Sequence, residues 1–101
     1  MSTYVATIAR GQFGLVTKTN LGQQGRIVYR VTIKPHLDER YFTARPDLFP
    51  GEEGKWLLDG PATSVSCSSL EDAEARIVDW AEMTYRDRAL EPTTTLPVWM
   101  D

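Results

Sequence analysis

Basic residues recur at every fourth position of one segment, as Arg26, Arg30 and Lys34, and a row of this kind can bind phosphates or carboxylates. The apolar side chains that alternate with them are Ile27, Tyr29, Val31 and Ile33. This alternation predicts a half-buried strand over 26–34 whose apolar face covers a core. The basic side chains would then share the open face, and Lys18 from the neighbouring predicted strand would join them.

An open basic sheet face has several interpretations. Sheets that bind nucleic acid usually carry aromatic side chains on which bases stack, and Tyr29, the only aromatic residue of 26–34, falls on the apolar side. An acidic protein is a second class of partner, and a face that meets only solvent is a further interpretation. The chain carries a net charge of −3. Solvent or a protein is therefore favoured over nucleic acid.

The other groups capable of chemistry are an imidazole, carboxylates and a thiol. His36, Asp38 and Glu39 stand within four residues of each other, and Cys67 is the only cysteine. The spacing of the first group matches no metal or acid–base motif, and polar residues between strands commonly serve solvation. A thiol beside the start of a helix is more often packed than nucleophilic. We therefore expect no enzyme activity, no metal site and no cofactor.

The length of 101 residues and the hydrophobic content of 42% describe one small globular domain. A chain of this size buries roughly 60–70% of its unfolded surface, which leaves little volume for a ligand pocket beside the core. No apolar run approaches the roughly 18 residues that cross a bilayer, and the first residues lack a signal-peptide pattern. A single cysteine excludes an internal disulfide. These features predict a cytoplasmic protein without membrane contact.

The charge is divided along the chain. Residues 1–45 carry seven basic and two acidic groups, a net charge of +5, and residues 46–101 carry four basic and twelve acidic groups, a net charge of −8. Such a chain can present one basic and one acidic surface.

Residues 68–88 carry the sustained helical periodicity of this chain. Ser68 followed by Glu71 is a capping-box pattern, and Ser69 is a second candidate for the N-cap. One stripe is apolar or small and consists of Leu70, Ala73, Ile77, Trp80, Ala81 and Thr84. The acidic residues away from this stripe are Glu71, Asp79 and Glu82, with Asp72 and Glu74 at the flanks. We expect the helix to cover one face of a sheet.

The acidic helix face could imitate a row of phosphates for a partner that binds nucleic acid. The predicted ion pairs Asp72–Arg76 and Glu82–Arg86 would neutralise part of that charge, because residues four apart are neighbours on a helix.

Further strand-forming segments lie at 4–10, 13–19, 41–44, 55–59 and 62–67. The pattern predicts a polar loop at 36–40, an edge strand at 41–44 and a long irregular loop at 45–54. Strands followed by a helix indicate an α+β fold. We expect a twisted antiparallel sheet of four or five strands, beginning as a meander, with one amphipathic C-terminal helix packed on one face. One domain would span 1–91 and an extended tail 92–101, because a proline follows the helix.

Apolar residues also occur outside the predicted elements. Leu48 and Phe49 stand between prolines, which stiffen the backbone, and Trp99 lies in the predicted tail. Each segment could fold back over the sheet as part of the core. Otherwise each supplies an aromatic anchor of the kind that dominates protein interfaces.

In size, charge and element order, the chain resembles small single-domain proteins carried by phages and mobile elements, among them inhibitors of host defence such as anti-CRISPR proteins. Together with the surfaces above, this favours a non-catalytic module that binds another protein and acts by occupying its surface. The predicted contact residues are Lys18, Arg26, Arg30, Lys34, Leu48, Phe49 and Trp99. A second copy paired through a sheet edge is a further partner. The alternative is a nucleic-acid-binding module that uses the basic open face.

Overall fold

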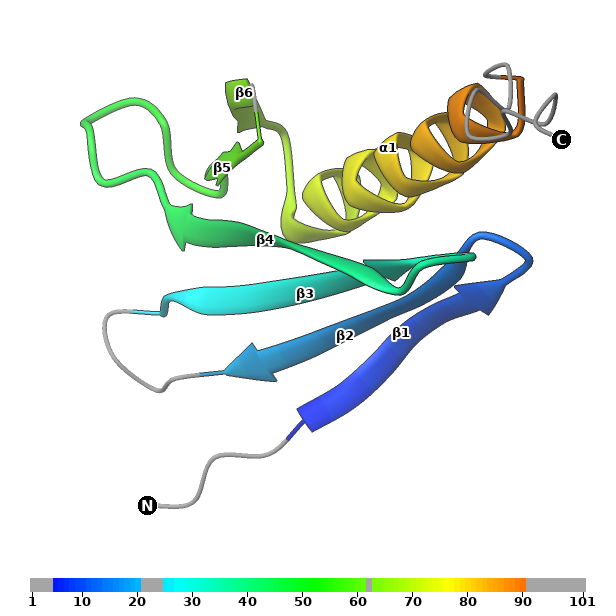
Figure 1. Ribbon diagram of the computed structural model, residues 1–101. Helices are drawn as coiled ribbons and strands as arrows, with labels where there is room; N and C mark the ends of the chain where they lie inside the picture. The colour runs from blue at the N-terminus through cyan, green and yellow to red at the C-terminus, as the bar shows by residue number, and fades with distance from the viewer. Residues whose placement is uncertain (1–4, 21–24, 62, 91–101) are drawn as a thin grey trace, which may run out of the picture.

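The computed structural model describes residues 5–20, 25–61 and 63–90. Within these ranges the chain forms a six-stranded sheet and one helix (Figure 1). The strands are β1 (Val5–Gly11), β2 (Gly14–Asn20), β3 (Ile27–Ile33), β4 (Asp38–Pro46), β5 (Trp56–Gly60) and β6 (Thr63–Cys67), and the helix is α1 (Leu70–Leu90). Each strand pairs antiparallel with the next one along the chain, so β1 and β6 are the edges of the sheet.

This architecture confirms the predicted α+β class, the meander and the C-terminal helix packed on one face. The sheet has six strands rather than four or five. The number is larger because every segment with strand-forming composition becomes a strand, including the short ones that follow β4.

The strand β4 is longer and more central than predicted. It begins at Asp38 and pairs with β3 on one side and β5 on the other. The predictions of a polar loop that reaches Arg40 and of an edge strand at 41–44 are therefore wrong. Glu39 and Arg40 are exposed, so their charged side chains meet solvent while their backbone pairs with β3. The charged composition of residues 38–40 is therefore compatible with a strand.

The core lies between α1 and one face of the sheet. The alternating apolar residues of β3 are at most 4% exposed, as predicted, and they are Ile27, Tyr29, Val31 and Ile33. From the helix, Ala73, Ile77 and Ala81 have no exposed surface, and Leu70 and Trp80 pack at the margin. The predicted helix stripe is therefore the surface that covers the sheet, and its alanines let the helix approach the strands closely.

The N-cap of α1 is Ser69 rather than Ser68. The backbone N–H of Asp72 donates to Ser69 Oγ at 3.0 Å, and the N–H of Ala73 donates to Ser69 O at 3.1 Å. The backbone N–H of Ser68 donates to Asp72 Oδ2 at 3.2 Å. The cap therefore uses the carboxylate of Asp72 and not that of Glu71.

The sheet curls across its width, so that β5 and β6 rise beside α1 while β1 lies farthest from it (Figure 1). The β4–β5 loop forms one end of the molecule, which we call the loop end. The β1–β2 and β3–β4 turns form the other end, together with the last turns of α1, and we call it the turn end.

Packing is close where β4, β5 and α1 meet. Phe42 is 2% exposed, and its ring meets that of Trp80 edge to face, with centroids 5.3 Å apart. A Cβ atom at Gly60 of β5 would overlap the Phe42 ring. Glycine at this position therefore makes room for the aromatic pair.

Replacing Gly60→Ala should lower the free energy of unfolding by about 1–3 kcal/mol, because the added methyl group must displace a packed ring. Gly11→Ala is the control, since its Cβ would come no closer than 3.3 Å to the Phe13 ring. Urea denaturation measures both variants. Equal stability of the two would show that the Phe42 ring moves aside at no cost.

Candidate functional site

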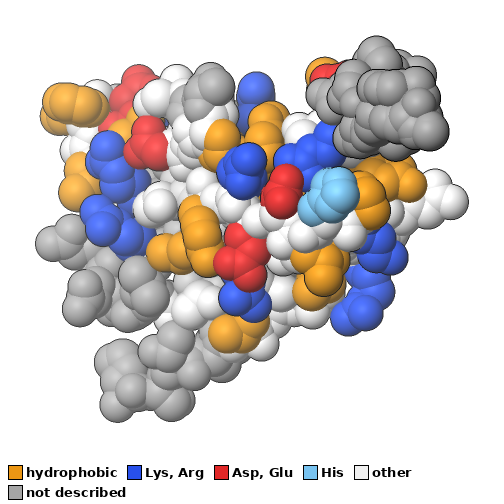
Figure 2. All heavy atoms as spheres, in the orientation of Figure 1, with side chains coloured by type: hydrophobic (Ala, Val, Ile, Leu, Met, Phe, Trp, Pro, Cys, Tyr) orange, Lys and Arg blue, Asp and Glu red, His pale blue; other side chains and the backbone are white. Residues whose placement is uncertain are grey.

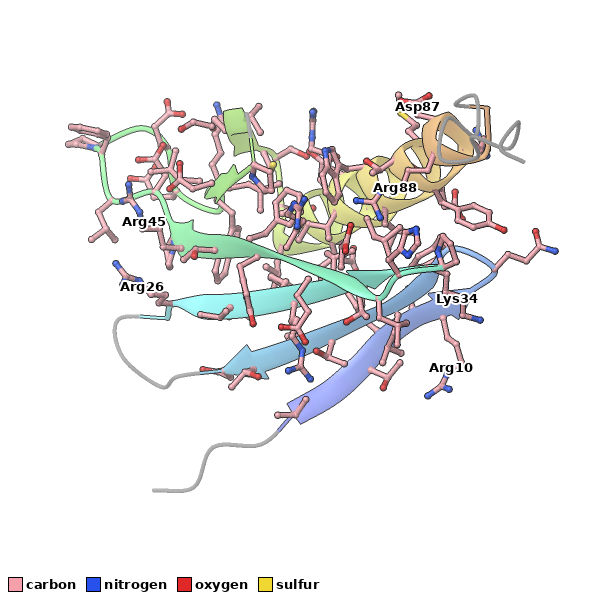
Figure 3. The ribbon with its side chains drawn as sticks, in the orientation of Figure 1. Arg10, Arg26, Lys34, Arg45, Asp87 and Arg88 are labelled. Carbon is pink, nitrogen blue, oxygen red and sulfur yellow. The ribbon has the colours of Figure 1, made fainter. Side chains whose placement is uncertain are left out.

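The predicted row of basic side chains is divided in the structure. Arg26 lies at the loop end and Lys34 at the turn end (Figure 3), with roughly 26 Å of strand between them. In the middle of β3, Arg30 Nη1 lies 3.8 Å from Glu39 Oε2, and each side chain is 48% exposed. The centre of the open face therefore holds a partly neutralised arginine and not a continuous basic row.

Lys18 lies on the opposite face from the one predicted. It pairs across the sheet with Tyr29 and points toward α1, where its Nζ lies 3.0 Å from Glu74 Oε2. The expectation that Lys18 joins Arg30 on the open face is wrong. Its acidic partner comes 56 residues later in the sequence, which is why the pattern around Lys18 alone could not reveal it.

The carboxylate of Glu74 joins the helix to two strands. Tyr29 Oη donates to Glu74 Oε2 at 2.5 Å, and Tyr29 has no exposed surface. Burial raises the pKa of Tyr29 above its ordinary value of 10.0, and the hydrogen bond to Glu74 and the charge of Glu74 raise it further. The phenol of Tyr29 is therefore a neutral donor at physiological pH.

The raised pKa of Tyr29 predicts a loss of stability at alkaline pH. Below pH 10.0 the phenol is protonated in both the folded and the unfolded chain; above it, the unfolded chain loses this proton while the folded chain keeps it. The free energy of unfolding therefore falls as the pH rises above about 10.

Chemical denaturation between about pH 8 and pH 11 tests this expectation. Tyr29→Phe should lower the alkaline slope of the unfolding free energy relative to Tyr41→Phe, which removes an exposed phenol instead. Identical slopes in the two variants would contradict the role assigned to Tyr29.

An aromatic side chain does stand on the open face. Tyr41 of β4 is 52% exposed and pairs across the sheet with Arg30. Its hydroxyl donates to Glu39 Oε1 at 3.0 Å, so Tyr41 and Arg30 share one carboxylate. Sequence reasoning missed this arrangement because β4 was expected to begin at Tyr41. Successive side chains of a strand point to opposite faces, so a buried Phe42 indicates that Tyr41 points to the open face.

The β4–β5 loop holds Leu48 and Phe49 in the open, 85% and 72% exposed, and neither folds back into the core. The backbone N–H of Asp47 donates to Lys55 O at 2.9 Å, and that of Phe49 donates to Asp47 Oδ1 at 3.1 Å. The N–H of Glu52 donates to Phe49 O at 3.0 Å. These bonds give the loop a defined shape although its apolar tip faces solvent.

Arginines lie beside this tip. Arg45 lines a depression of about 250 Å³ together with Leu48, Phe49, Leu57 and the loop residue Asp47. Arg26 is adjacent, because Ile27 pairs with Ala44 and a Cβ at Gly25 would lie 3.0 Å from Pro46 (Figure 3). In the described part of the chain, neither arginine forms an ion pair.

We call Arg26, Arg45, Leu48, Phe49 and Leu57 the loop-end surface. Figure 2 shows hydrophobic, basic and acidic side chains at this end of the molecule. Both arginines are exposed, so their charges are open to a partner. Sequence reasoning identified Arg26, Leu48 and Phe49 but did not bring them together, and it missed Arg45. The register of β3 and β4 is what brings Arg45 close to Arg26. That register could be inferred only if β4 was known to begin before Tyr41.

The imidazole and the thiol lie at opposite ends of α1. His36 is in the β3–β4 turn, and Cys67 closes β6 just before the helix, so roughly 30 Å of helix separates them. Cys67 is 1% exposed, and this burial raises the pKa of its thiol. Asp38 Oδ2 forms an ion pair with Arg88 Nη2 at 2.8 Å. Across ranges 5–20, 25–61 and 63–90, no group of three His, Cys, Asp or Glu residues could hold a metal ion.

On the outer face of α1, the predicted ion pair between Asp72 and Arg76 is present, with Arg76 Nε 3.4 Å from Asp72 Oδ2. Glu74, expected at the flank of that face, points to the sheet instead. No helix in the described ranges combines the length and hydrophobicity needed to cross a membrane.

Trp99 and the predicted tail over 92–101 lie outside the described residues.

Comparison with known proteins finds no matching family model, no matching curated protein and no matching solved structure.

Proposed function

We propose that this chain is a non-catalytic protein-binding module and that its contact surface is the loop-end surface. The observation that carries the proposal is the exposure of Leu48 and Phe49, 85% and 72%, in a loop held by its own hydrogen bonds. An exposed aromatic side chain on a preorganised loop binds with little loss of conformational entropy. Phe49 is the anchor, and Leu48 and Leu57 extend the apolar contact.

The charges beside the anchor define the partner. Arg26 and Arg45 are unpaired within the described residues, and Lys55 Nζ lies 3.0 Å from Glu52 Oε1 and is thereby neutralised. The partner is a protein with an apolar pocket for Phe49 and acidic residues along the rim. Its carboxylates would form ion pairs with the two arginines. The chain acts by occupying that surface, as an inhibitor does, and thereby excludes the partner's other ligands.

Replacing Phe49→Ala should weaken binding by about 2 kcal/mol or more, roughly 30-fold in Kd, because it removes the apolar anchor. The matched control is Met83→Ala on α1, a 59% exposed apolar residue away from the loop end. Each tagged variant is used to capture proteins from a lysate of the source organism, and the captured partner is then titrated by calorimetry. Equal Kd values for the two variants would exclude the loop-end surface.

The contribution of loop order can be separated from that of the contact residues. Asp47→Ala removes the carboxylate that accepts the N–H of Phe49 and keeps Leu48 and Phe49. It should raise Kd several-fold, because a more mobile loop loses more conformational entropy when it binds.

The contribution of charge is tested by Arg45→Glu, which should slow association with the partner and remove part of the salt dependence of the association rate. A salt-independent association rate in the unmodified chain would contradict the acidic rim.

The alternative function, nucleic-acid binding on the open face, gains support from Tyr41 beside Arg30. Glu39 opposes it, because this carboxylate contacts both side chains and would repel phosphates. A mobility-shift assay at two salt concentrations separates the functions. Tight, steeply salt-dependent binding that is lost in Arg30→Glu and retained in Phe49→Ala would replace the protein-binding proposal.

A further inference from the structure

A pocket at the turn end is independent of the loop-end surface. The β3–β4 turn and the last turns of α1 enclose a depression of about 570 Å³, within the usual range for small-molecule sites. Its described lining residues are Lys34, Pro35, Leu37, Tyr85 and Arg88. Figure 3 shows Lys34 arriving from the turn and Arg88 from the helix at this end of the molecule.

The guanidinium of Arg88 is only partly satisfied. Its Nη2 lies 2.8 Å from Asp38 Oδ2, whereas its Nη1 is buried and has no hydrogen-bond partner among the described residues. A buried cationic donor without an acceptor is costly, so this atom calls for an additional acceptor oxygen. Lys34 adds a second cation at the rim, and its ammonium group forms no ion pair within the described ranges.

The rest of the lining is largely apolar. Pro35 and Leu37 come from the turn, and Tyr85 comes from α1 one turn before Arg88. Leu37 has a φ of 57° and is 59% exposed, an unusual backbone conformation for a bulky apolar residue. The turn thus holds an apolar side chain beside the two cations. A ligand that matches this lining combines an apolar body with a charged group.

The charge balance selects a singly charged anion. Lys34 and Arg88 supply two positive charges, and Asp38 already balances one of them. The carbonyl groups at the C-terminal end of α1 also disfavour a concentrated negative charge. A dianionic phosphate fits this balance less well than a carboxylate. The planar carboxylate also suits the donor geometry of a guanidinium.

We propose that the turn-end pocket binds an apolar carboxylate, with the carboxylate oxygens at the Arg88 guanidinium and Lys34 and the apolar body against Pro35, Leu37 and Tyr85. This ligand chemistry has two sources, a free small-molecule acid and the C-terminal carboxylate of a peptide. The free acid and the peptide would each bind the same two cations. Only in the peptide does a backbone continue from the bound carboxylate.

The test is an NMR titration of the ¹⁵N-labelled full chain with matched pairs of probes. The free acid is represented by 2-naphthoate and its neutral control 2-naphthamide. The peptide is represented by N-acetyl-Leu-Phe with a free C-terminus and by its C-terminal amide. A carboxylate probe should shift the amide signals of Leu37 and Tyr85 saturably, at least about tenfold more tightly than its neutral control. Which acid binds more tightly identifies the source.

Variants then test the two cations. Arg88→Gln should weaken binding by about tenfold or more, and Lys34→Gln by about threefold or more, because each removes a charge at the carboxylate. Arg86→Gln is the control, an exposed arginine of the same helix that does not line the pocket. If Arg88→Gln loses the dispersed spectrum of a folded chain, Lys34→Gln decides, since it leaves the Arg88–Asp38 pair intact.

Several results would overturn the proposal. These are equal affinity for a carboxylate and its neutral amide, unchanged affinity in Lys34→Gln, and no saturable shift at Leu37 or Tyr85 with either acid at millimolar concentration.

Discussion

The arrangement of helix and sheet depends on a single carboxylate at the edge of the core. Glu74 Oε2 accepts from Tyr29 Oη and lies 3.0 Å from Lys18 Nζ, so one side chain of α1 meets both β2 and β3. A partly buried carboxylate is costly without its donors, and only one placement of α1 supplies both. Apolar packing around Ala73 and Ile77 and the contact between Trp80 and Phe42 hold the helix on this face of the sheet. The polar contact adds a directional constraint, and the Arg88–Asp38 ion pair adds another near the end of the helix.

The placement of the helix determines which surfaces remain available. With α1 over one face, the other face of the sheet presents Arg30, Tyr41 and Glu39 to solvent. The helix runs from the Cys67 end of β6 to the β3–β4 turn, so its last turn brings Arg88 to Asp38 and forms one wall of the turn-end pocket. The β4–β5 loop lies at the other end and makes no part of that wall. The turn-end pocket therefore depends on the position of the helix, whereas the loop-end surface does not, and changes in one can leave the other intact.

The features predicted correctly from sequence are those governed by local periodicity. The alternation in β3 and the stripe of α1 each placed the buried residues on the right face, because burial repeats with the period of the element. Long-range pairing explains the errors. The charged residues Asp38 to Arg40 join β4 because β3 offers them a backbone partner, and nothing within 38–40 indicates this. Lys18 was assigned to the open face because its partner Glu74 lies far along the chain.

The candidate surface was predictable only in part, for the same reason. Prolines around Leu48 and Phe49 marked an apolar loop, and the structure leaves these side chains exposed. The juxtaposition of Arg26 and Arg45 depends on the register of two strands and could not be read from either segment alone. Arg88 was not singled out, since its unpaired Nη1 is a property of the folded chain.

The only cysteine of the chain has a practical consequence through its position. Cys67 is buried at the junction of β6 and α1, and its raised pKa keeps the thiol protonated. A thiol reagent can then react only after β6 and the start of α1 separate. The rate at which a thiol reagent labels Cys67 therefore reports how often this junction opens. No additional cysteine has to be introduced for the measurement.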